Sequence, residues 1–237
     1  MRRLSFIMKK NLSKITIKFF LNQNLAPMRQ HDKSFYPLYV LTTFQRKSTQ
    51  FKSKSEEYFE DIDSLKKNRP DILQFEERIL RKMVEYEVEK TGEDKFTLKG
   101  LSERYPYYAI SIYIALETYL KDKLQKQMLS SANPLALVPH YENPAVTVSL
   151  LYTAAVRLFP GFESKMPAQL IEELQAYEYY QTLFPLEFYM YDFAVIIEWL
   201  NGDHEKVLEE AFTNVYGNKP AELNRIIALL NKATAEQ

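Results

Sequence analysis

Alternation of apolar and polar side chains is the feature that most constrains the fold, and it runs through residues 13–53. Three segments show the period of two that is typical of half-buried strands, at residues 15–21, 36–43 and 47–53. The second and third segments are joined by a connection of hairpin length at residues 44–47. The sequence therefore predicts a small three-stranded antiparallel sheet near the N-terminus.

The two faces of this sheet differ in character. One face is apolar and needs a helix to cover it, because a sheet of this size is not stable alone; its members are Ile15, Ile17, Phe19, Leu38, Val40 and Phe51. The open face would present Lys18, Tyr39, Thr43, Gln50 and Lys52 to water. Cations can contact DNA phosphates, and amides or hydroxyls can reach base edges. An ordinary wetted sheet face has the same composition, so both interpretations stay open.

The charge distribution is strongly asymmetric although the formal net charge is zero. Residues 1–55 carry 12 Lys or Arg and one acid, Asp32, whereas residues 129–237 carry 6 basic and 14 acidic residues. A basic segment on an acidic body indicates contact with a polyanion. It would equally suit a basic sheet that docks on an acidic protein surface, either its own or that of a partner.

The basic stretch also carries a family resemblance. The segments Ile15 to Leu21, Tyr36 to Val40 and Arg46 to Ser53 resemble the N-terminal arm-DNA-binding segment of tyrosine recombinases (phage-integrase type) from Bacteroidetes mobile elements. The resemblance covers about residues 13–55 and implies a three-stranded sheet with a helix that binds arm-type DNA sites. By position, the residues facing DNA would be Lys18, Tyr39, Arg46, Lys47, Gln50 and Lys52. Leu41 departs from the family, in which this open-face position is often polar or basic.

The rest of the chain is predicted to be mainly helical. Asn68 and Pro70 are suited to the start of a helix that runs to about residue 90, and Pro106 is expected to open a long helix. Further helices are predicted at about 145–159, 167–183, 186–200, 204–216 and 220–233.

We therefore expect an α+β protein whose N-terminal sheet is followed by a mainly α-helical body. Residues 1–67 would form the basic sheet, and residues 68–132 a helical pair. Residues 133–144, which contain three prolines, would form a linker to an acidic all-α domain at residues 145–237.

No pattern of residues predicts catalysis. The resemblance would imply a His-x-x-Arg element for DNA cleavage, and none of His31, His140 and His204 lies in one. The chain has no Cys and only five Gly, and it lacks a phosphate-binding glycine loop and a His-Glu-x-x-His motif. His140 and His204 are expected to be surface residues. We predict that the protein is not an enzyme and has no catalytic residue, metal site or cofactor.

The leading hypothesis is a non-catalytic protein that binds double-stranded DNA through the sheet. The alternative is a protein–protein interaction module, in which residues 145–237 hold a partner or a second copy of the chain. That segment is rich in aromatic residues, notably at 177–180 and 188–193. No apolar run is long enough to span a membrane, and the absence of Cys fits a cytoplasmic location.

Overall fold

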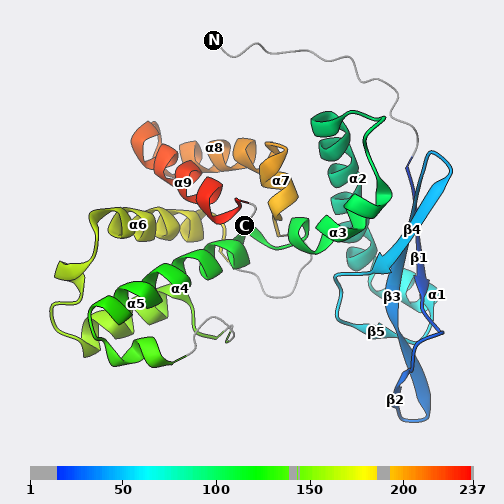
Figure 1. Cartoon of the computed structure of the whole chain (residues 1–237), viewed down its shortest axis with the longest axis horizontal. Coiled ribbons are helices and arrows are strands. Elements are labelled where there is room, and N and C mark those ends of the chain that lie inside the picture. The colour runs from blue at the N-terminus through cyan, green and yellow to red at the C-terminus, as the bar shows by residue number, and fades with distance from the viewer. Residues whose placement is uncertain (1–14, 139–142, 144, 186–192, 236–237) are drawn as a thin grey trace. The chain divides into compact units, whose positions relative to one another are not determined.

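The computed structural model of the protein describes residues 15–138, 143, 145–185 and 193–235 (Figure 1). The chain divides into two compact units, with a boundary between Ala109 and Ile110. The first unit contains β1 (Thr16–Leu21), β2 (Met28–Gln30), β3 (Lys33–Phe44), β4 (Lys47–Lys52), β5 (Tyr58–Phe59), α1 (Ile62–Asn68), α2 (Pro70–Thr91) and α3 (Leu98–Tyr108). The second contains α4 (Ile112–Ser130), η1 (Pro134–Leu137), α5 (Val148–Leu158), η2 (Glu163–Lys165), α6 (Ala168–Leu183), α7 (Ile196–Leu200), α8 (Asp203–Tyr216) and α9 (Pro220–Ala233).

The α+β class is confirmed, but the sheet is larger than the sequence predicted. In the described residues it has five strands rather than three, and each of the others pairs antiparallel with β3. The expected strands are β1, β3 and β4, and the additional ones are the short strands β2 and β5. β3 is therefore the long central strand on which the first unit is built.

The additional hairpin between β2 and β3 depends on an unusual turn. Gln30 pairs with Lys33, so the loop holds only two residues, His31 and Asp32. Both have positive φ, 47° and 62°, as a type I′ turn requires. Type I′ turns usually have the sequence Asn-Gly or Asp-Gly. Because His31-Asp32 contains no glycine, the sequence predicted a polar loop here instead of a hairpin.

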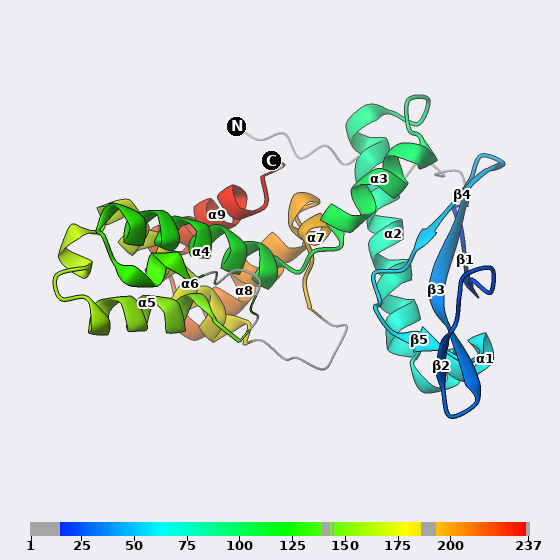
Figure 2. The same ribbon diagram turned by 60° about the horizontal axis from the view of Figure 1, so that its bottom comes forward.

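The covered face of the sheet packs against the helices of the first unit. Leu38 and Val40 of β3 are fully buried, and Leu38 contacts Leu65 of α1 and Ile72 of α2. Phe51 of β4 lies against Tyr105 of α3 with ring centroids 4.8 Å apart. Figures 1 and 2 show α2 and α3 on one side of β3, so the face predicted to be apolar is the face that the helices cover.

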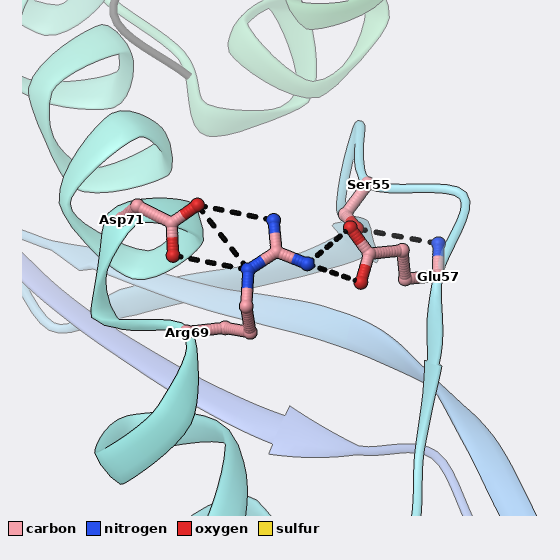
Figure 3. A network of polar contacts seen from close by, with 4 residues as sticks. All are labelled: Ser55, Glu57, Arg69 and Asp71. Carbon is pink, nitrogen blue, oxygen red and sulfur yellow. Dashed lines mark hydrogen bonds and ion pairs between the residues drawn. The ribbon is translucent and has the colours of Figure 1, made fainter. Parts of the chain in front are cut away.

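Arg69 joins the segment after β4 to the junction between α1 and α2 (Figure 3). Its guanidinium donates to both carboxylate oxygens of Glu57 at 2.6 and 2.7 Å and to Asp71 at 3.0 to 3.3 Å. The hydrogen bonds from Arg69 hold the pKa of Asp71 below its usual range. A planar guanidinium suits this two-sided role, because its donors form a rigid fork.

Two predicted helix starts are wrong. Asn68 is the last residue of α1, and Arg69 occupies the N-cap of α2 without a side-chain cap hydrogen bond, although Pro70 opens that helix as expected. Pro106 lies inside α3 instead of opening the long helix. That helix, α4, begins after Ser111, whose hydroxyl accepts from the backbone N–H of Tyr113. The start of α4 is therefore set by a serine N-cap and not by a proline.

The second unit has a continuous apolar core built by α4, α5, α6, α8 and α9. Inside it lies an ion pair of α4, in which Lys121 Nζ is 3.0 Å from Glu117 Oε2 and both side chains are almost fully buried. Glu117 also accepts from the backbone N–H of Val148 at the start of α5 and from the hydroxyl of Tyr177 in α6. Burial and the Glu117 carboxylate raise the pKa of Tyr177. One carboxylate thus joins three helices.

His204 is buried, which corrects the expectation of a surface residue. Its Nε2 is 2.9 Å from the hydroxyl of Tyr180, and its ring packs near Phe184 and Trp199. Burial lowers the pKa of His204 to about 4, so the imidazole is neutral at pH 7. The sequence did not show this, because the surrounding rings come from other helices.

Some expectations fall on segments of which nothing is described. His140, residues 188–192 of the aromatic run and residues 186–192 of the helix expected at 186–200 lie outside the described residues; within the rest of that expected helix, α7 covers Ile196–Leu200. The expected linker at 133–144 falls in the second unit, and the helical pair expected at 68–132 is divided between the units. No helix in the described ranges combines the length and apolar character needed to cross a bilayer.

Candidate nucleic-acid interface

The register of β1, β3 and β4 assembles the open face of the sheet into three rows across the strands. Side chains directly opposite each other in an antiparallel pair point to the same face. The rows are Thr16–Thr43–Ser48, Lys18–Leu41–Gln50 and Phe20–Tyr39–Lys52. We call these nine residues the open face. It contains two lysines and no acid, and Lys18, Gln50 and Lys52 are exposed.

The two outer rows have defined internal contacts. The hydroxyls of Thr43 and Ser48 lie 2.8 Å apart, and the rings of Phe20 and Tyr39 have centroids 5.9 Å apart. Leu41 is half-buried at the centre of the open face, next to Lys18 and Gln50. The open face is therefore a mixed surface with an apolar centre and cationic sides.

Arg46 and Lys47 lie at the hairpin between β3 and β4 rather than in these rows. Gln45 and Arg46 form the two-residue turn, with φ values of 47° and 65°. Lys47 pairs with Phe44, so it shares the side-chain direction of Thr49 and Phe51, although it is exposed beyond the end of the covered face. Of the six residues predicted to face DNA, the sheet gathers four on one face and places two at its tip.

The cations of this region lack acidic partners. Within the described part of the chain, Lys18, Arg46, Lys47 and Lys52 form no ion pair. Lys33 of the neighbouring hairpin, by contrast, is paired with Glu60 at 2.7 Å. The four positive charges are thus available to an external anion.

A buried carboxylate fixes the end of β4 behind the open face. Glu76 of α2 is fully buried and accepts from the hydroxyls of Ser53 and Tyr105 and from the backbone N–H of Lys54 at 2.7 Å. Burial raises the pKa of Glu76, and these hydrogen bonds oppose that rise. Sequence reasoning missed this anchor; the only signal was an acid beside Phe75 in an apolar stripe of the helix.

Across residues 15–138, 143, 145–185 and 193–235, no group of three or more His, Asp or Glu side chains could hold a metal ion. No protein-family model matches the chain, and no curated protein or solved structure shows significant similarity to it.

Proposed function

We propose that the protein binds double-stranded DNA through the open face and the β3–β4 hairpin, without catalysing a reaction on it. The observation that carries the proposal is the register of β1, β3 and β4, which places Lys18 and Lys52 on one acid-free face with Gln50. Arg46 and Lys47 extend the positive charge at the tip of the hairpin.

The dimensions of the sheet suit a DNA groove. Neighbouring strands lie about 4.8 Å apart, so β1, β3 and β4 span about 10 Å. The major groove of B-DNA is about 12 Å wide. In that position Lys18 of β1 and Lys52 of β4 would contact phosphates on either side, and Leu41 of β3 and the neighbouring Gln50 of β4 would face the bases.

Gln50 and Leu41 of the central row would then provide the base contacts. The amide of Gln50 can bond to adenine, and apolar side chains contact the methyl group of thymine. Leu41, which departs from the recombinase pattern, would take the second role beside Gln50. A preference for sites containing A·T pairs follows.

The recombinase resemblance supports the same surface, since it implies an arm-DNA-binding sheet. The alternative is a basic sheet that docks on an acidic protein surface. Within the described part of the first unit, neither Lys18 nor Lys52 pairs with an acid, so both stay open to an external anion. DNA is therefore the ligand that we propose.

The test is binding of the full chain to a 20-base-pair duplex across a salt series. Four phosphate contacts predict a slope of about −3.6 in a plot of log K against log salt, and a loss of affinity on the order of 100-fold between 50 and 200 mM salt. Absence of binding at 50 mM would reject the proposal. An equally tight complex with polyglutamate would instead favour the acidic protein surface.

Arg46→Gly should stabilise the fold and weaken DNA binding at once. A non-glycine residue at positive φ costs about 1 kcal/mol, so glycine at φ 65° should raise the free energy of unfolding by about that amount. Removal of one cation should make the salt slope less negative by about 1. Urea denaturation and duplex titration measure the two effects.

The matched control is Asp32→Gly in the β2–β3 turn, where φ is 62°. It should bring a similar gain in stability with no loss of affinity for DNA. If both variants lose affinity equally, the Arg46 side chain makes no contact of its own, and rigidity of the hairpins is the property that binding needs.

A further inference from the structure

A hollow of ≈ 470 Å³ lies in the second unit, between α6, α8 and α9. Its lining includes Glu178 and Tyr179 of α6, Tyr216 at the end of α8, and Glu222 and Arg225 of α9. Residues from three helices thus converge on one space, of a size typical of small-molecule sites. Nothing in the DNA proposal uses it.

Two tyrosine rings form part of the wall in a fixed arrangement. The rings of Tyr179 and Tyr216 meet edge to face, with centroids 5.0 Å apart and planes at 89°. Both also contact the buried ring of Phe212, at 6.2 and 5.1 Å. The rings are therefore held by the core, and aromatic rings are groups that attract cations.

The charges of the lining favour a cation as well. In the described residues, the carboxylates of Glu178 and Glu222 form no hydrogen bond or ion pair. Arg225 also lines the hollow, and its guanidinium makes one long ion-pair contact, 3.8 Å from Glu172, which lies outside this lining. Two unpaired carboxylates and one guanidinium therefore line the hollow, so its formal charge is negative.

We propose that this hollow binds an alkylammonium or guanidinium group, with Glu178 and Glu222 as counter-ions and the rings of Tyr179 and Tyr216 as the aromatic wall. An anionic ligand would meet two carboxylates. A purely apolar ligand would desolvate them without compensation. The cation can belong to a free polyamine or to a lysine or arginine side chain of a partner protein, and both present the same chemistry.

The first experiment titrates the full chain with n-butylammonium and follows the tyrosine ring signals by NMR. Saturable shifts of Tyr179 and Tyr216 are expected in the millimolar range. The matched probes are n-butanol and butyrate, which keep the alkyl chain and change the charge, and they should bind at least tenfold more weakly. Equal binding of butanol, or no shift with butylammonium at 50 mM, would overturn the proposal.

A pair of variants assigns the site. Glu178→Gln with Glu222→Gln should weaken butylammonium binding at least tenfold. The control, Glu209→Gln with Glu210→Gln, removes the same charge from exposed positions on α8 and should leave the affinity unchanged. Equal weakening in both would mean that net charge alone attracts the amine, and would reject the site.

Spermidine and a short lysine-containing peptide then separate the two sources. Tighter binding of spermidine identifies a free polyamine, and tighter binding of the peptide identifies a protein side chain. Both outcomes are independent of DNA binding, because the salt series tests the open face in the first unit and the amine titration tests the hollow in the second.

Discussion

Duplex DNA will bind at least 100-fold more weakly when Lys18 and Lys52 are both replaced by glutamate. The two lysines lie on β1 and β4, on opposite sides of β3. Loss of two phosphate contacts should make the salt slope less negative by about 2, from about −3.6 to about −1.8. The new carboxylates add repulsion from the phosphates. Fluorescence anisotropy of a labelled duplex at 100 mM salt measures both the affinity and the slope.

The fold should tolerate this change. Both lysines are exposed and have no ion-pair partner in the described residues, so the free energy of unfolding should change by no more than about 0.5 kcal/mol. A urea titration of the variant checks that a loss of binding is not a loss of structure.

Lys66→Glu with Lys67→Glu is the matched control, because it makes the same change in net charge on an exposed turn of α1. It should lower the affinity less than fivefold at 100 mM salt. A loss as large as that of the sheet variant would show that DNA responds to the overall field of the protein, and the open face would then have no special role.

The features that could be predicted from the sequence are those governed by local periodicity. Ile17, Phe19, Val40 and Phe51 point to one face because strand side chains alternate, whatever lies elsewhere in the chain. The same alternation puts Lys18 and Gln50 together on the opposite face. Pairing register follows from it, since a slip by one residue would expose the whole apolar set.

Contacts between residues far apart in the chain could not be predicted from local periodicity. The partners Glu76 and Tyr105 are 29 residues apart, and Glu117 and Tyr177 are 60 apart. In the sequence, Glu76 and Glu117 cannot be distinguished from acids on a helix surface, because the partner of each lies on another helix. The hollow lined by Glu178, Tyr216 and Glu222 is a case of the same kind, because no spacing in the sequence connects three helices.

Glu117→Ala should destabilise the protein by about 3–5 kcal/mol, the largest effect expected of any single substitution considered. The change leaves the ammonium of Lys121 buried and unpaired, and it removes the acceptor of the Val148 N–H and the Tyr177 hydroxyl. Urea denaturation measures it as a lower midpoint, and an unchanged m-value would show that the native state stays compact.

A second ion pair on the same helix provides the control. Asp122 and Lys126 have the same i, i+4 spacing and a shorter distance, 2.6 Å against 3.0 Å, but their side chains are 55% and 72% exposed. Asp122→Ala should therefore cost no more than about 0.5 kcal/mol, because water solvates the lysine that remains.

Burial, and not the distance between the charges, is the quantity that separates these two variants. Glu117→Ala combined with Lys121→Met should recover much of the lost stability, because a methionine needs no counter-ion in the core. If the double variant is as unstable as Glu117→Ala, the lost stability comes from the hydrogen bonds of Glu117 to Val148 and Tyr177. It does not then come from the unpaired ammonium of Lys121. Either result identifies which property of this carboxylate holds α4, α5 and α6 together.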